Sequence, residues 1–183
     1  SWAGLAGRFV AGFADFDDAT GGLRPGELLL LVGKPGLGKT KFILQMADQL
    51  ADAGHPGVVY EMETGEEAVM DRMLSRRCRI PTSRLETGDI HEDEWPAYTR
   101  AIEKYSSLDH KLYLDFSTGW TTTGLRADLT RLKAEKNIEW FMVDYLKFLN
   151  DSYGDSETDR QNWISRNLKM ICNDLRLAGV VIH

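Results

Sequence analysis

The stretch Gly33-Lys34-Pro35-Gly36-Leu37-Gly38-Lys39-Thr40 decides the fold of this chain. It follows the apolar run 28–32 and precedes segment 42–53, in which apolar residues recur at helical spacing. A strand, a glycine-rich loop and a helix that starts near Lys-Thr form the context in which the pattern G-x-x-x-x-G-K-[ST] binds phosphate. The pattern therefore predicts a phosphate-binding loop for a nucleoside triphosphate.

The chemistry of this loop gives each part a role. Glycines let successive backbone N–H groups point at one anion, and the first turn of the following helix adds free N–H groups and the positive end of its dipole. Lys39 can reach the β- and γ-phosphates as a cation, and the Thr40 hydroxyl can ligate Mg²⁺. The predicted nucleotide-binding residues are Gly33, Lys34, Pro35, Gly36, Leu37, Gly38, Lys39, Thr40 and Lys41.

The composition is that of one soluble globular domain, with 43% hydrophobic and 27% charged residues among 183. A net charge of −6 excludes a broadly basic surface for nucleic acid, so any contact with DNA or RNA would be local. Cys78 and Cys172 lie far apart in the sequence, and we expect buried, reduced thiols of a cytoplasmic protein. No apolar stretch approaches the ~18 residues that span a bilayer, and no signal peptide precedes the fold, so we expect no membrane association.

The alternation of strands and helices predicts an α/β fold with a mostly parallel sheet covered on both faces. Strands are expected at 28–32, 58–63, 111–116 and 138–144, with a fifth beginning at Val180. Helices are expected from the phosphate loop to Ala53 and at 66–77, 92–106, 123–136 and 160–177, while 81–89 and 150–159 are expected to be irregular. Residues 1–26 are interpreted as a linker remnant and lead-in segment before a core at 27–183, with a type II turn at Pro25-Gly26.

Acidic residues follow two of the predicted strands, where an open α/β sheet binds its ligand. Asp144 closes an apolar strand, and a carboxylate there can hold Mg²⁺ directly or through water. Glu61 and Glu63 lie two apart, so we expect both on one face of their strand. One of them could orient and deprotonate an attacking water, but their spacing alone does not choose between them.

Two predicted helices carry residue patterns that we interpret as surface or core features rather than as ligand sites. An arginine cluster in helix 66–77 is interpreted as a solvated face rather than a ligand site: Arg72, Arg76 and Arg77. Helix 92–106 has four large side chains at the spacing of a buried face: Trp95, Tyr98, Ile102 and Tyr105.

Several segments together resemble the RecA-like motor domain of the DnaB-type replicative helicases, including their phage relatives. The similar segments are 12–27, 33–40, 60–63 with Glu67 and Arg72, 85–90 with Glu94-Trp95, 113–119, Thr121, Thr123, Arg126, 143–146 and 164–169. The phosphate loop and the Asp-Tyr-Leu strand are shared by many RecA-like ATPases. Thr87-Gly88 before Glu94-Trp95, and Ser-Arg-Asn-Leu-Lys at 165–169, narrow the likeness to this family, from about residue 12 onward.

The resemblance implies a RecA-like P-loop NTPase core that hydrolyses ATP with Mg²⁺ and unwinds duplex DNA as a homo-oligomeric ring, expected to be a hexamer, around single-stranded DNA. Its register selects Glu63 over Glu61 as the catalytic glutamate. The implied catalytic residues are therefore Glu63 and Lys39, and the implied metal ligands are Thr40 and Asp144. A cytoplasmic location in a bacterial or phage-infected cell follows from the same likeness.

The sequence also departs from that family. The family's γ-phosphate sensor, arginine finger and several DNA-contacting loops fall after residue 183, so we expect a core that is incomplete at its C-terminus, with the fifth strand as an exposed sheet edge. Segment 150–159 contains four acids that would repel phosphates, which argues against DNA contact there. Two alternatives stay open: a RecA-like nucleotide-binding or regulatory module without unwinding activity, and, less favoured because no substrate lid is visible, a small-molecule P-loop kinase.

Overall fold

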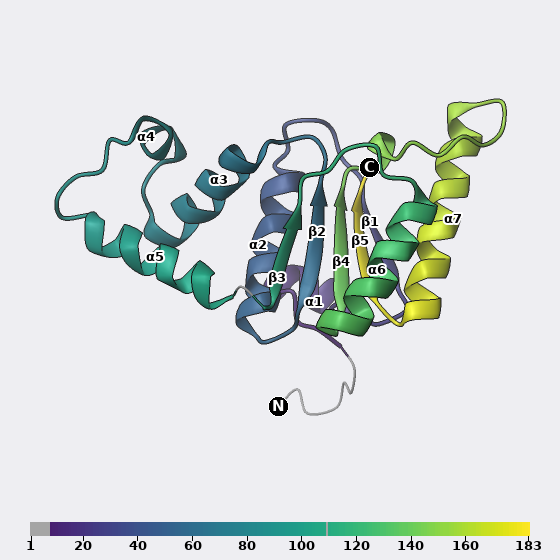
Figure 1. The fold of residues 1–183 in the computed structure, drawn as a ribbon, viewed down its shortest axis with the longest axis horizontal. Helices are drawn as coiled ribbons and strands as arrows, with labels where there is room; N and C mark the ends of the chain where they lie inside the picture. Colours follow the sequence, from purple (N-terminus) through teal and green to yellow (C-terminus); the bar gives the residue numbers. More distant parts are fainter. Residues whose placement is uncertain (1–7, 109) are drawn as a thin grey trace.

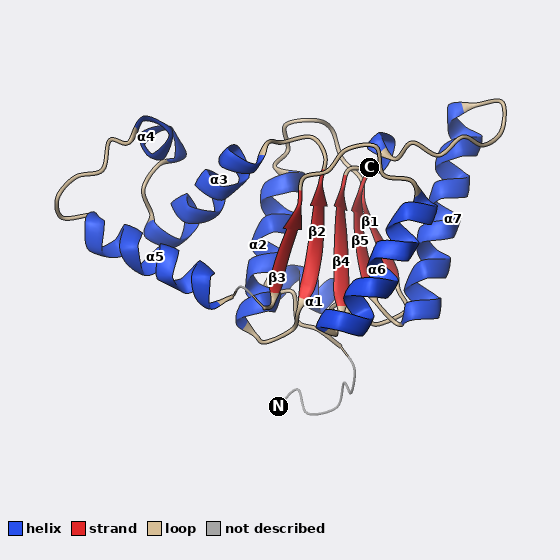
Figure 2. Cartoon of the chain, in the orientation of Figure 1, coloured by secondary structure: helices blue, strands red, loops and turns tan. Residues whose placement is uncertain are grey.

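The computed structural model describes residues 8–108 and 110–183. Within them, one parallel sheet runs in the order β1-β5-β4-β2-β3 (Figure 2). The strands are β1 (Leu28–Leu31), β2 (Gly57–Glu61), β3 (Leu112–Asp115), β4 (Trp140–Asp144) and β5 (Ala178–Ile182). The predicted α/β fold with a parallel sheet is confirmed.

Helices cover both faces of this sheet (Figure 1). They are α1 (Ala14–Thr20), α2 (Lys39–Asp52), α3 (Glu66–Cys78), α4 (Thr82–Thr87), α5 (Trp95–Ser107), α6 (Thr122–Lys136) and α7 (Glu157–Leu175), with a 3₁₀ turn, η1, at Leu146–Phe148. One core cluster joins α6 and α7 to the sheet, and a second joins α2 and part of α3 to the other face. A third, smaller cluster holds α3, α4 and α5 together in a lobe that projects beyond the β3 edge (Figure 1).

The central strands show why the sequence has continuous apolar runs. In β4, Phe141 and Val143 belong to the cluster under α6 and α7, whereas Trp140 and Met142 belong to the cluster under α2. All four are fully buried, since successive side chains of a strand point to opposite faces and both faces are covered here.

The position of β5 contradicts the expectation of an exposed fifth strand. β5 pairs with β1 on one side and β4 on the other, so it lies inside the sheet, and it begins at Ala178 rather than Val180. The edge strands of the described sheet are β1 and β3. The prediction assumed that the last strand in the sequence lies at the edge of the sheet. A crossover connection instead inserts β5 between β1 and β4, which precede it in the sequence.

Two helices form where none was predicted. α1 lies in the lead-in segment, where the carboxylate of Asp17 accepts the backbone N–H groups of Ala11, Gly12 and Phe13 and so fixes the approach to the helix. α4 lies within the predicted irregular segment 81–89 and ends at Gly88, which has a positive φ of 70°. Both helices are short and lack the repeating apolar face on which the prediction relied.

The start of α7 and the buried face of α5 also differ from the prediction, in each case because of nearby contacts. α7 begins before residue 160 because the Ser156 hydroxyl accepts the N–H of Asp159 as a helix cap. In α5 the predicted buried face is wrong for Trp95 and Ile102, which are 49% and 41% exposed, since α5 packs in the lobe against α3.

Other expectations hold. The turn before β1 is confirmed, with Gly26 at φ 87° and the N–H of Glu27 on the Arg24 carbonyl at 3.0 Å. Cys78 and Cys172 are free and buried, as predicted. Across the described ranges, no helix combines the length and the apolar character that a bilayer crossing requires.

Candidate nucleotide-binding site

The phosphate loop connects the carboxyl end of β1 to the first turn of α2. Gly36 and Gly38 have φ values of 81° and 82°, a conformation that side-chain-bearing residues rarely adopt. Gly38 is the N-cap of α2 and provides no side chain to cap it. The free N–H groups of the first helical turn are therefore left for a ligand, as an anion site requires.

The ammonium group of Lys39 lies against this loop. Its Nζ donates to the carbonyl oxygens of Gly33, at 2.5 Å, and Lys34, at 3.2 Å. These contacts span the loop from the end of β1 to the start of α2. The cation is therefore held beside the backbone that would surround a phosphate.

Thr40 and Asp144 meet although they are 104 positions apart in the sequence. The Thr40 hydroxyl donates to Oδ2 of Asp144 at 2.6 Å. A hydroxyl and a single carboxylate at a phosphate loop suit Mg²⁺, which binds through few protein oxygens and completes its shell with water and phosphates. The two residues predicted as metal ligands are thus adjacent, and their donor set fits that ion.

A cavity of about 550 Å³ opens over the loop. Seven of the nine predicted nucleotide-binding residues line it; Lys34 and Leu37 do not, and both are exposed. Its other lining residues are Val32, Glu63, Thr64, Arg72, Asp144, Tyr145, Lys147, Ile182 and His183. Sequence reasoning missed Thr64, Tyr145, Lys147 and His183 because it searched the ends of β2, β4 and β5 for carboxylates only.

Glu61 and Glu63 have different surroundings, so the expectation that they share a strand face is wrong. β2 ends at Glu61, which is 1% exposed, and Glu63 follows in a bend at the cavity. Oε1 of Glu61 accepts the N–H groups of Glu63, at 3.0 Å, and Thr64, at 2.8 Å. The catalytic role of Glu63 stays a prediction, and its place in the cavity wall is compatible with it.

Burial shifts the pKa values of two carboxyl groups at the strand ends, those of Glu61 and Asp144. Burial, followed by the charge of Asp144, raises the pKa of Glu61 to about 7. Burial also raises the pKa of Asp144, while the hydrogen bond from Thr40 opposes that shift. The strand ends therefore hold a pair of acids that repel each other unless a proton or a cation lies nearby.

The arginine cluster of α3 is not a solvated face, contrary to the prediction. Arg77 is 14% exposed at its side chain; it pairs with Asp48 and, at 2.8 Å, with Asp52 of α2. Arg76 also pairs with Asp48, which is 1% exposed and therefore requires a partner. The signal that could have revealed this is the i, i+4 pair of acids on the helix after the phosphate loop.

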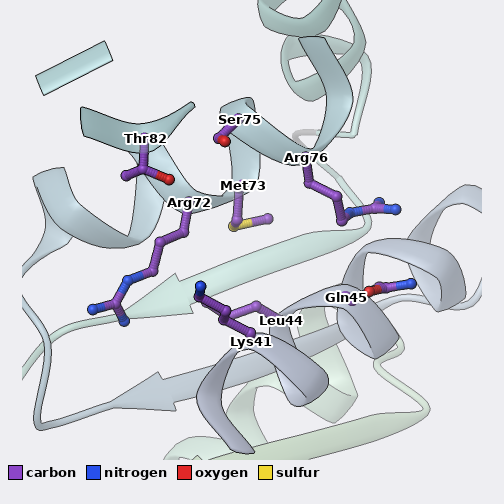
Figure 3. A pocket seen from close by; sticks show the side chains of 8 residues that line it. All are labelled: Lys41, Leu44, Gln45, Arg72, Met73, Ser75, Arg76 and Thr82. Carbon is purple, nitrogen blue, oxygen red and sulfur yellow. The ribbon is translucent and has the colours of Figure 1, made fainter. Parts of the chain in front are cut away.

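Arg72 points the other way, toward the phosphate loop. It lines the nucleotide cavity, and its Nη1 lies 3.4 Å from the Thr64 hydroxyl. A second cavity, of about 220 Å³, separates α2 from α3, and Figure 3 shows Lys41 and Arg72 facing it from these two helices. The remaining lining residues are Leu44, Gln45, Met73, Ser75, Arg76 and Thr82. Lys41 and Arg72 thus border both cavities.

Comparisons with known proteins agree with this geometry. The family model of the DnaB-like helicase C-terminal domain matches residues 9–183. The replicative DNA helicase DnaC of Bacillus subtilis is 31% identical over 175 residues, and the replicative DNA helicase DnaB of Haemophilus influenzae is 29% identical over 177 residues. The matches cover 93% and 94% of this chain and 38% of each helicase.

Two solved structures share the fold. One, a solved ATPase domain, superposes with a TM-score of 0.88 at 21% identity, covering 98% of this chain and 65% of that one. A DnaB-like replicative helicase, solved in a study of its interactions with primase, gives 0.86 at 22% identity, covering 94% of this chain and 42% of that one. The predicted RecA-like core is therefore confirmed as a fold, and the chain belongs to the DnaB-like helicase C-terminal domain family.

Proposed function

We propose that this domain binds ATP with Mg²⁺ and hydrolyses it. The observation that carries the proposal is the Thr40–Asp144 hydrogen bond at the phosphate loop, in a cavity that Glu63 also lines. Together these residues provide an anion site, a metal site and a candidate base within one cavity. Family membership supports the same assignment.

In the proposed mechanism, each group acts on a different part of the nucleotide. The loop N–H groups and Lys39 bind the β- and γ-phosphates and offset their charge. Thr40 and Asp144 would hold the ion, which supplies Lewis-acid stabilisation of the phosphate oxygens when bound. Glu63 accepts a proton from the water that attacks the γ-phosphorus, so that the P–O bond to the β-phosphate breaks and ADP leaves.

For the complete protein, we propose ATP-dependent unwinding of duplex DNA by a homo-oligomeric ring, expected to be a hexamer with single-stranded DNA in its pore. Support comes from the family and from relatives named as replicative DNA helicases. These names favour the motor over the alternative of a regulatory module without unwinding activity. The expected location is the cytoplasm of a bacterial or phage-infected cell, which suits two free, buried cysteines.

Two substitutions in the complete protein separate binding from hydrolysis. Lys39→Ala removes a cation from the phosphates and should cost about 2–3 kcal/mol of Mg-ATP binding, the scale of a charge-assisted hydrogen bond, in a calorimetric titration. Glu63→Gln should bind Mg-ATP normally yet lower turnover by ~10²-fold or more, the scale of a lost general base.

Lys111→Ala, which exchanges a lysine outside the cavity, is the matched control for Lys39. ATP affinity that does not change in Lys39→Ala would disprove the phosphate-loop assignment. Turnover abolished by Glu61→Gln, but preserved in Glu63→Gln, would show that the family register was applied wrongly.

A further inference from the structure

Glu61 is a buried acid that the proposed mechanism does not use. It is 1% exposed at the end of β2 and does not line the cavity. In the register of the sheet it pairs with Asp144 of β4, so the two acids are neighbours. Its Oε2 is buried and accepts no N–H or O–H donor from the other described residues, and a hydrogen bond links its carboxyl group to that of Asp144. Burying a carboxyl in this way costs free energy, which calls for a compensating role.

The contacts of Oε1 indicate what that role is. This oxygen accepts the N–H groups of both Glu63 and Thr64, so it closes the bend that follows β2. Both residues line the nucleotide cavity, and the Thr64 hydroxyl lies 3.4 Å from Nη1 of Arg72. One side chain therefore fixes the backbone of two residues that line the cavity.

Glu61 also connects these two residues to the neighbouring strand β4. Its strand partner Asp144 accepts the Thr40 hydroxyl at 2.6 Å, which places the metal side of the cavity directly beside it. The backbone of Met62 adds a hydrogen bond to the Asp144 carbonyl at 2.9 Å. The distance between Glu63 and the metal-binding pair is thus set through residues 61 and 62.

We infer that Glu61 is a positioning residue for hydrolysis: by holding the amides of Glu63 and Thr64, it fixes the Glu63 carboxylate relative to Thr40 and Asp144. The inference rests on the proposed function, in which Glu63 deprotonates the attacking water. Misplacing a reacting group by about 1 Å can cost ~10²-fold in rate, so a side chain that fixes this bend controls turnover without touching the nucleotide.

Two conservative substitutions test whether reach or charge matters. Glu61→Gln keeps the side-chain length and an oxygen that can accept both amides, whereas Glu61→Asp keeps the charge but is one methylene too short. In the complete protein we expect Glu61→Gln to retain most of the wild-type kcat. Glu61→Asp should lose up to ~10²-fold in kcat with little change in the KM for ATP, because only orientation is disturbed.

Amide hydrogen exchange supplies a readout that does not depend on activity. The N–H groups of residues 63 and 64 should be as protected in Glu61→Gln as in the wild type and should exchange faster in Glu61→Asp. Asp17→Ala is the matched control, since Asp17 is also a buried carboxylate that accepts backbone N–H groups, and it belongs to α1, which lies near the opposite end of the strands (Figure 1). It should leave kcat unchanged.

The possible failures are distinguishable. A wild-type protein that binds Mg-ATP without hydrolysing it would overturn the proposed function. If the wild type hydrolyses ATP and Glu63→Gln does not, a fully active Glu61→Asp, or a Glu61→Gln as defective as Glu61→Asp, would overturn only the inference. A loss confined to KM would do the same. If Glu61→Asp fails to fold, Glu61→Leu, which has a similar volume but no acceptor for the two amides, replaces it in both measurements, and unchanged kcat and amide protection in Glu61→Leu would overturn the inference.

Discussion

At the scale of single residues, Asp144 occupies a position in which a charged carboxylate is costly. It is 1% exposed, accepts a short hydrogen bond from Thr40 and lies beside Glu61, a second buried acid. Burial raises the pKa of Asp144, and a divalent ion would stabilise the charged form that burial disfavours. The residue therefore has the surroundings expected of a metal ligand whose ion arrives with the nucleotide.

Asp144→Asn should weaken the dependence of nucleotide binding on Mg²⁺. Its amide oxygen can still accept the Thr40 hydroxyl, but the charge is lost. We expect the Mg²⁺ concentration for half-maximal nucleotide binding to rise ~10–100-fold, the equivalent of about 1.5–3 kcal/mol for an interaction with a charged group. A fluorescent nucleotide titrated at several Mg²⁺ concentrations measures this.

Nucleotide binding in excess chelator provides the control, since it should be similar in the wild type and Asp144→Asn. An unchanged Mg²⁺ requirement would remove Asp144 from the metal site.

The sequence predicted where the candidate site lies better than it predicted the side-chain contacts around it. The phosphate loop and Asp144 could be located because their spacing follows from phosphate and metal chemistry. The burial of Glu61 could not, because it depends on where β2 ends. The pairing of Arg77 with Asp48 was missed although Asp48 and Asp52 gave a signal for it, because the pairing also depends on which face of α3 turns toward α2.

At the scale of elements, the connection between α4 and α5 is held by ion pairs of Arg84 with Glu94 and with Asp89. Nη1 and Nη2 of Arg84 donate to the two carboxylate oxygens of Glu94 at 2.8 and 2.7 Å. Glu94 also accepts the N–H of His91 at 2.9 Å. The Arg84 hydrogen bond, followed by that of His91, lowers the pKa of Glu94 to about 2.

Glu94→Gln should therefore lower the melting temperature at neutral pH. A carboxylate whose pKa is lower in the folded chain binds fewer protons there than in the unfolded chain, so its stabilisation is present above about pH 4.5 and is lost as the pH falls toward 2. The difference in melting temperature between wild type and Glu94→Gln should shrink over that range, as followed by circular dichroism.

Glu103→Gln on α5 is the matched control, because Glu103 is exposed and makes no ion pair with the described residues. A difference that persists at pH 2 would mean that shape rather than charge makes Glu94 important.

Long elements were more predictable than short ones. α2, α3 and α6 match their expected ranges closely because an apolar face recurs along each. α4 has no buried residue to mark such a face. Trp95 and Ile102 obey the helical spacing and still lie exposed, because no layer of the described chain covers that side of α5 in the lobe.

At the scale of the whole molecule, the site lies at the carboxyl ends of the strands, over β1, β5, β4 and β2. An arginine finger supplied in trans to a nucleotide site stabilises charge in the transition state of phosphoryl transfer and is worth on the order of 10³–10⁵ in rate. Residues 1–183 correspond to 38% of the replicative helicases that they match. The proposed ring is therefore a separate hypothesis from the cavity described here.

Residues 1–183 studied alone should bind Mg-ATP but hydrolyse it slowly, without stimulation by single-stranded DNA and without unwinding. A coupled ATPase assay with and without an oligonucleotide, together with sedimentation to determine the oligomeric state, measures this. Brisk DNA-stimulated hydrolysis would instead place the catalytic arginine within these residues. Arg72, Arg126 and Arg166 would then be the first to substitute.

The pairing of β1 with β5 has a consequence for how the molecule folds. Leu28 lies opposite Gly179, and β5 is the only strand in the described sheet that holds β1, the strand leading into the phosphate loop. Closing so long a stretch of chain is entropically costly, and contacts this distant in sequence slow folding. During synthesis the phosphate loop would leave the ribosome long before its supporting strand. Nucleotide binding should therefore appear late in folding and in a single step, when β5 pairs with β1 and completes the sheet, rather than as an early local event.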